Sequence, residues 1–215
     1  MNLYGFAGND GVNRWDYLGY LVIELISDYL DGNGSPKSAD EIWKQLHQGG
    51  NAIYKGKNVK IEPPLRHDPN MDRNKGGAVK QHNEADVFYD SSDDSRCSLK
   101  GEINHFVFSL VMNTSKTRKK VFSNDYWGTA HHEVKHIQSR LRRLQNIVDI
   151  ASDWPSEFET PEVAERARKG YQMLLDQMLI DATEKEGDHD QDGGFGTPRE
   201  GTPEPGWGGW MPGDK

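Results

Sequence analysis

The spacing of apolar residues along the chain predicts two amphipathic helices in its second half. In the first, which begins near Trp127, apolar positions recur at intervals of four and three residues and therefore share one face. They are Ala130, Val134, Ile137, Leu141, Leu144, Val148 and Ala151. The second helix follows Thr160, a suitable N-cap, and Pro161, which favours the first helical position. It extends to about Glu184 through Ala164, Ala167, Tyr171, Leu174, Leu175, Met178 and Ala182.

A capping box predicts a shorter helix nearer the start of the chain. Ser38 and Glu41 have the spacing that lets each side chain accept a hydrogen bond from the other residue's backbone N–H. The apolar positions of this helix are Ile42, Trp43 and Leu46. The two glycines at 49–50 end it. Before it, residues 21–30 are apolar with acidic interruptions, which is consistent with a short helix or a linker.

Strands are predicted between these helices. Residues 103–112 have the strongest strand pattern, because β-branched and aromatic residues dominate them. Their apolar character is almost continuous, so both faces of the strand are expected to be covered. Weaker strand patterns occur at 59–61 and 87–89. Residues 186–215 are rich in Gly, Pro, Asp and Trp and lack periodicity, which predicts a disordered tail. The predicted fold is therefore α+β, with a small sheet, two main helices and this tail.

Composition narrows the class of protein. A chain of 215 residues is long enough for one ordinary domain with appendages, and its 34% hydrophobic content places part of it outside the core. The net charge of −8 argues against a dedicated nucleic-acid binder. The single cysteine, Cys97, excludes an internal disulfide framework and a cysteine-rich zinc site. The chain has no apolar run long enough to span a membrane and no conventional signal peptide.

The helix that begins near Trp127 carries the clearest chemical motif of the chain. His132, Glu133 and His136 form the pattern His-Glu-x-x-His. Residues four apart share a helix face, so the two imidazoles can converge on one metal ion. Glu133 is close enough to polarise a water molecule bound to that ion. The histidines are expected on the side opposite the apolar stripe, where they are free to line a cleft. His131 is expected to be an exposed or supporting neighbour.

This motif resembles that of the zincin metallopeptidases. The resemblance implies a zinc-dependent endopeptidase in which His132 and His136 bind Zn²⁺ and Glu133 is the general base and acid. In such a site the zinc ion keeps one position for water and lowers the pKa of that water towards ~7. The strong strand before the helix is also typical of zincins, where an edge strand pairs with extended peptide substrates.

A zincin site needs a third protein ligand, and the sequence offers several acids. The residues after the motif lack the His-x-x-Gly-x-x-His continuation that would indicate the metzincin subclass. If the second helix packs antiparallel against the first, its later half faces the histidines. Asp181 is then the preferred ligand, because it lies nearest to the edge of the apolar stripe. The alternatives are Asp176, Glu184, Glu165 and Glu159.

Residues 1–20 alternate aromatic residues with Gly, Asn and Asp. This segment closely resembles the C-terminal end of the Rhs/YD-repeat-associated core domain, with the form N-L-Y-x-Y-x-x-N-x-P-x-N-x-x-D-P-x-G-L, although Gly11 and Tyr17 stand where that family has proline. In that family the core forms a shell, and a variable toxin domain follows it. The resemblance implies an Rhs core end at 1–20, a zincin-like toxin domain at 21–185 and a tail at 186–215.

The same resemblance implies partners and a destination. The expected substrate is a protein or peptide of a target cell, reached through a dedicated secretion system rather than a conventional signal peptide. The expected partners are the Rhs shell of the parent polypeptide and a cognate immunity protein that protects the producing cell.

Two other functions compete with the peptidase. The first is a metal-dependent nuclease toxin, because basic residues surround the motif and could contact nucleic acid. These residues are Lys116, Arg118, Lys119, Lys120, Arg140, Arg142 and Arg143. The second is a non-enzymatic Rhs-associated binding domain in which the histidine motif is accidental. Zinc content separates these possibilities, because only the peptidase requires one zinc ion held by the two histidines.

Overall fold

The computed structural model describes residues 19–48, 50–54, 57–61, 64–71, 76–113 and 124–192. Residues 50–54, 57–61, 124–127 and 184–192 are described by their backbone alone. Most of the Rhs-like segment, the basic residues at 116–120 and the tail beyond residue 192 lie outside the described residues.

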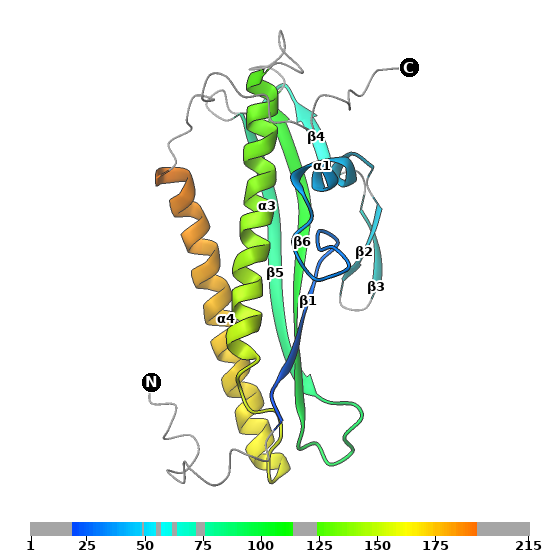
Figure 1. The fold of residues 1–215 in the computed structure, drawn as a ribbon, viewed down its shortest axis with the longest axis vertical. Helices are drawn as coiled ribbons and strands as arrows, with labels where there is room; N and C mark the ends of the chain where they lie inside the picture. Colours follow the sequence, from blue (N-terminus) through cyan, green and yellow to red (C-terminus); the bar gives the residue numbers. More distant parts are fainter. Residues whose placement is uncertain are drawn as a thin grey trace.

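The sheet is built around one long strand, β6 (Leu99–Asn113). β5 (Gly77–Tyr89) pairs antiparallel with β6, from Gly77 opposite Met112 to Tyr89 opposite Leu99. β1 (Val22–Ile26) and β4 (Leu65–Asp68) pair parallel with opposite ends of β6, on the edge that β5 leaves open. β2 (Gly50–Tyr54) and β3 (Lys57–Ile61) form a separate antiparallel pair. The sheet is therefore mixed, with β5 at one edge (Figure 1).

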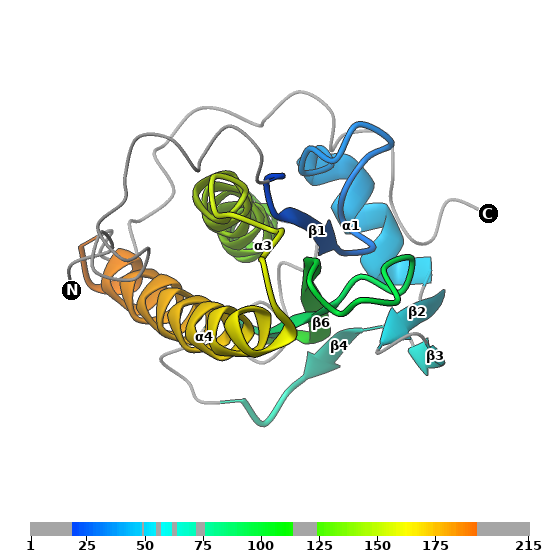
Figure 2. The same cartoon turned by 90° about the horizontal axis from the view of Figure 1, so that it is seen from below.

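In the described part of the chain, three helices accompany the sheet. α3 (Asn124–Ala151) runs along its length, and α4 (Pro161–Asp192) returns beside α3 and packs against β5 (Figure 1). α1 (Ala39–Gln48) packs against α3 on the side away from α4 (Figure 2). The two long helices are antiparallel, which is the condition on which the choice of Asp181 depended, and the predicted α+β class is confirmed.

The core has two parts, and α3 contributes to both. Its C-terminal half packs with α4, β1 and one end of β5–β6. Its N-terminal half packs with α1 and the other end of β6. All seven residues of the predicted stripe on α3 are buried, and a fully buried leucine contributes about 1.5–3 kcal/mol to stability. This double role fixes the position of α3 against the sheet.

The local signals at the helix ends are confirmed. The Ser38 backbone N–H donates to Glu41 Oε2 over 2.9 Å, and the Glu41 N–H donates to Ser38 Oγ over 3.3 Å. The Val163 N–H donates to Thr160 Oγ1 over 3.3 Å, so Thr160 caps α4. α4 does not end near Glu184, because the chain contains no proline between Pro161 and Asp192 and the helix continues to Asp192.

One prediction of secondary structure is corrected, and one is confirmed but too short. The short helix or linker predicted at 21–30 is wrong at its start, where β1 forms with buried Ile23 between exposed Val22 and Glu24. The strand predicted at 87–89 is the end of a much longer strand, β5. Residues 19–21, just before β1, contact the turn after α3, because the Ser156 N–H donates to the Gly19 carbonyl over 2.7 Å.

Candidate metal centre

The two histidines of the motif face each other on α3. The Nε2 atoms of His132 and His136 are 3.0 Å apart. Their rings are nearly perpendicular, at 89°, with centroids 4.6 Å apart. The helix therefore brings together one nitrogen from each ring, as the four-residue spacing predicts.

This separation fits a shared metal ion. Two nitrogens bound to a tetrahedral zinc ion at 2.0–2.1 Å lie about 3.3 Å from each other. The observed distance also fits a hydrogen bond between one protonated and one unprotonated nitrogen. A zinc ion binds the neutral form of imidazole, through either Nε2 or Nδ1.

Glu133 is held against the start of β5. Its side chain is only 3% exposed. A Cβ atom added at Gly77 would lie 2.9 Å from Glu133 Cγ and 3.0 Å from Oε1. Those distances are too short for a real side chain, so the backbone of β5 approaches Glu133 as closely as a glycine allows. The strand thereby holds the Glu133 side chain against β5 and limits its contact with water.

The motif is more deeply buried than the sequence indicates. The histidines were expected to be free to line a cleft, but His136 is 6% exposed and His132 is half-buried. The reason is that β5 crosses α3 here. Gly77 meets Glu133, and Gln81 Nε2 donates to the His136 carbonyl over 3.4 Å. The site therefore lies between α3 and the edge strand of the sheet.

A buried histidine of β6, His105, makes hydrogen bonds to Gln81 of β5 and to Ser27, just after β1. His105 is 2% exposed. Its Nδ1 lies 2.9 Å from Ser27 Oγ, and its Nε2 lies 3.0 Å from Gln81 Oε1. Burial, with a smaller effect from the charge of Arg140, lowers the pKa of His105 to about 3. His105 is therefore neutral at physiological pH.

Arg140, one turn after His136 on α3, donates hydrogen bonds to both β5 and α4. Its Nη1 donates to Asn83 Oδ1 over 2.7 Å and to Thr183 Oγ1 over 2.8 Å. Arg143 donates to the Ala182 carbonyl over 2.9 Å. Two of the basic residues that suggested nucleic-acid binding thus serve contacts between α3, α4 and β5. Those at 116–120 lie outside the described residues.

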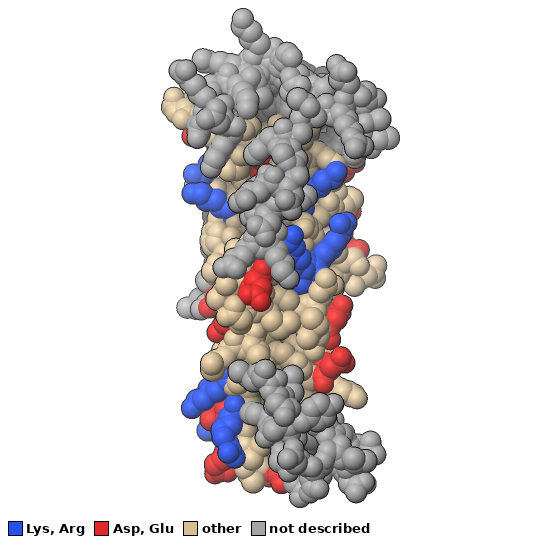
Figure 3. Space-filling model, turned by 90° about the vertical axis from the view of Figure 1, so that its left-hand side faces the viewer, with Lys and Arg blue, Asp and Glu red and all other residues tan. Residues whose placement is uncertain are grey.

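The surface over α4 has mixed charge. Figure 3 looks onto this side of the molecule, and both Lys/Arg and Asp/Glu side chains are spread over it. Among the described residues on this face, the basic side chains do not merge into one continuous surface. The described side chains on this face therefore do not form a broad basic surface of the kind that favours nucleic acid.

The structure does not bring the predicted third ligand beside the histidines. Among the described residues, no third His, Cys, Asp or Glu completes a group that could hold a metal. Asp181 is exposed and accepts a hydrogen bond from Gln177 over 2.8 Å. Asp176 is also exposed and accepts from Gln172 over 2.9 Å. The side chain of Glu184 is outside the described residues, and Glu159 is exposed in the turn before α4.

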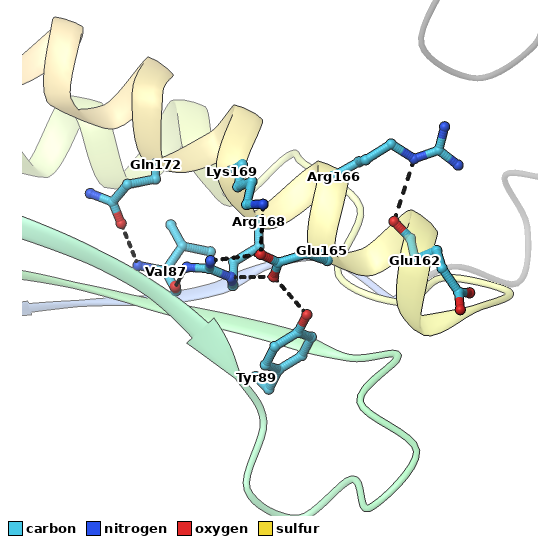
Figure 4. Close-up of polar contacts among 8 residues, drawn as sticks. All are labelled: Val87, Tyr89, Glu162, Glu165, Arg166, Arg168, Lys169 and Gln172. Carbon is cyan, nitrogen blue, oxygen red and sulfur yellow. Dashed lines mark hydrogen bonds and ion pairs between the residues drawn. The ribbon is translucent and has the colours of Figure 1, made fainter.

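Glu165, another candidate, has a structural role at the opposite end of β5 (Figure 4). Arg168 donates to both of its carboxylate oxygens, over 2.7 and 3.0 Å, and Tyr89 Oη donates over 2.8 Å. These hydrogen bonds, those of Arg168 most strongly, hold the pKa of Glu165 well below its usual range. Its oxygens are occupied far from the motif along β5, so Glu165 is not positioned as a zinc ligand.

Three residues near the motif escaped the sequence analysis: Gly77, Gln81 and His105. The available signals were indirect. A pair of glycines, Gly76 and Gly77, stands at the start of β5, and a histidine interrupts the apolar run of β6. Neither pattern indicates a site until the pairing of β5 with β6 is known.

Comparisons with known proteins identify no relative. No family model, no curated protein and no solved structure matches the chain. No helix of the described residues has the length and apolar character needed to cross a membrane. The argument for function therefore depends on the residues themselves.

Proposed function

We propose that this chain is a zinc-dependent endopeptidase that acts as the toxin domain of an Rhs-type polypeptide. The observation that carries the proposal is the 3.0 Å separation between the Nε2 atoms of His132 and His136, beside a buried Glu133. A carboxylate next to two converging imidazoles is the minimum set for metal-assisted hydrolysis. The resemblance of residues 1–20 to an Rhs core end supports delivery into a target cell and a cognate immunity protein.

The chemistry would divide between the metal and Glu133. When bound, zinc supplies a Lewis acid that polarises the peptide carbonyl and acidifies a coordinated water molecule. Glu133 takes a proton from the attacking water as the new C–O bond forms. Glu133 then gives that proton to the amine nitrogen as the C–N bond breaks. Its burial against Gly77 keeps the carboxylate in one orientation for both transfers.

The register of α3 against α4 suggests a third ligand. Arg143 contacts Ala182, and Arg140 contacts Thr183. One turn toward the start of α3 from Arg140 is His136, and one turn further along α4 from Ala182 is Glu186. By helical spacing alone, position 186 follows those of Leu175, Leu179 and Ala182 along α4. We therefore propose Glu186 as the third ligand, ahead of Asp181.

Metal content tests the proposal directly. The purified full-length chain should contain about one zinc ion, and His132→Ala or His136→Ala should remove it. His131→Ala is the matched control, since this neighbouring histidine lies outside the pair, and should keep zinc. Glu186→Gln should weaken zinc binding by about tenfold or more, whereas Asp181→Asn should not.

Enzymatic activity provides a second test of the proposed function. Glu133→Gln should keep zinc and lose both proteolysis and toxicity on expression. A fully active Glu133→Gln variant would contradict the peptidase assignment. Magnesium-dependent degradation of plasmid or RNA by the purified chain would instead support a nuclease. A wild-type chain without metal and without toxicity would support a binding domain.

A further inference from the structure

We propose that Gln81, held by the buried pair Ser27–His105, is a positioning residue that restrains the turn of α3 from which His136 faces His132. This inference rests on the proposed metal site and assigns a role to residues outside the motif. Four hydrogen-bonded groups connect the end of β1 to the motif helix through the middle of the sheet. Each hydrogen bond between these groups has a defined donor and a defined acceptor.

The donor and the acceptor of each hydrogen bond follow from the His136 carbonyl, which is the last group in the series. The His136 carbonyl can only accept, so the Gln81 amide must present its nitrogen there, at 3.4 Å. The Gln81 oxygen therefore faces His105 Nε2, at 3.0 Å, and that nitrogen must carry the proton. His105 Nδ1 is then an acceptor, and the Ser27 hydroxyl donates to it over 2.9 Å. Only one tautomer of His105 satisfies all three contacts.

A β-bulge puts these side chains under α3. Lys80 pairs with Ser109, but Gln81 pairs with Val107, so Phe108 is an extra residue in β6. The bulge lets His105 and Val107 face the helices together with Leu110 and Met112, which are buried beyond it. Without it, His105 would point to the other face of the sheet.

Gln81 and Asn83 then contact successive turns of α3. Side chains two apart on a strand point to the same face. Gln81 contacts the His136 carbonyl, and Asn83 accepts from Arg140, four residues later. The Arg140 N–H is the helical partner of that same His136 carbonyl. Strand β5 thus contacts α3 on both sides of one helical bond, which restricts rotation of the turn that presents His136.

The test replaces Gln81 with methionine, which keeps the length of the side chain and removes its polar contacts. Gln172→Met is the matched control. Gln172 also joins a helix to β5, accepting from the Val87 N–H over 2.9 Å and donating to the Ala85 carbonyl over 2.8 Å, but at the end away from the motif. Zinc affinity would be measured by competition with a chelator, and the geometry of the site by the visible absorption of the cobalt-substituted full-length chain.

We expect Gln81→Met to lower zinc affinity about tenfold or more and to change the cobalt spectrum. Gln172→Met should leave both unchanged. Gln81→Glu keeps the acceptor for His105 but has no donor for the His136 carbonyl, and it should lower zinc affinity as well. In the metal-free chain, the carbonyl carbon resonance of His136 should shift in Gln81→Met and not in Gln172→Met.

Two outcomes would overturn the inference in distinguishable ways. If the wild-type chain binds zinc and Gln81→Met binds it with unchanged affinity and an unchanged cobalt spectrum, the positioning role fails and the metal site stands. If the wild-type chain binds neither zinc nor cobalt, the proposed function fails and the positioning role fails with it.

Discussion

The two ends of strand β5 meet the helices in opposite ways. At the Tyr89 end, Glu165 is matched by Arg168 and Lys169 on its own helix and by the Tyr89 hydroxyl (Figure 4). At the Gly77 end, Glu133 is buried against β5, and the imidazoles of His132 and His136 on the same helix face each other.

We interpret the Tyr89 end as structural and the Gly77 end as part of the proposed site. Opposite charges placed side by side satisfy one another and need nothing more. Two imidazole nitrogens that face each other can share one proton or, in the function proposed above, one metal ion. The Tyr89 end should therefore control stability, and the Gly77 end should control metal binding and chemistry.

The largest expected contrast is between the two glutamates of these ends. Glu133→Gln should reduce peptide hydrolysis by about 10²–10⁴-fold, because it removes the proton acceptor and donor. Glu165→Gln should leave hydrolysis unchanged. Turnover of a peptide library by both zinc-loaded variants measures this, and equal losses would erase the distinction between the two ends.

A core substitution near the Tyr89 end should affect stability alone. Leu175 is fully buried on α4, so Leu175→Ala should lower the free energy of unfolding by about 2–5 kcal/mol. Zinc affinity of the folded fraction should not change. Urea unfolding and zinc titration of the same sample check both parts, and a parallel fall in zinc affinity would show that the two ends are coupled.

Gly77→Ala should displace the Glu133 side chain by steric contact. The added methyl group would lie 2.9 Å from Glu133 Cγ, so the carboxylate must move, and we expect hydrolysis to fall by roughly tenfold or more. Gly170→Ala on α4 is the control, since nothing lies within 4 Å of its added Cβ. That variant should be stabilised by about 0.5–1 kcal/mol with unchanged activity. Unchanged hydrolysis in Gly77→Ala would mean that β5 does not orient Glu133.

The smallest effect should appear in the acid stability of the Tyr89 end. Because the pKa of Glu165 is lower in the folded chain, its contribution is complete above its unfolded pKa, about 4.3, and is lost as the pH falls below that value. Glu165→Gln should therefore be less stable than the wild type at pH 7, with a smaller difference at pH 3. Urea unfolding at the two pH values measures this, and a difference that grows on acidification would contradict the assigned role.

The features predicted from the sequence are those fixed by neighbouring residues. The stripe on α3, the caps of α1 and α4 and the convergence of His132 and His136 depend only on helical spacing. β5 was largely missed, since Gln81 and Asn83 occupy helix-facing positions where a half-buried strand normally has apolar residues. Because these side chains of β5 are polar, the strand lacks the alternation of apolar and polar residues from which it could have been predicted.

The rest of the site depends on pairing between distant segments. Gly77 lies against Glu133 only because β5 pairs with β6 in this register. The choice among the acids of α4 depends on the contact between Arg140 and Thr183, which no local pattern reveals. The third ligand is therefore the part of the site least accessible to sequence analysis.

The central claim is that His132 and His136 bind one zinc ion. X-ray absorption at the zinc edge of the purified full-length chain tests it most directly. We predict a shell that includes two imidazole nitrogens at about 2.0–2.1 Å, and its loss in His136→Ala. A chain that carries no zinc, or a zinc shell without imidazole, would contradict the account.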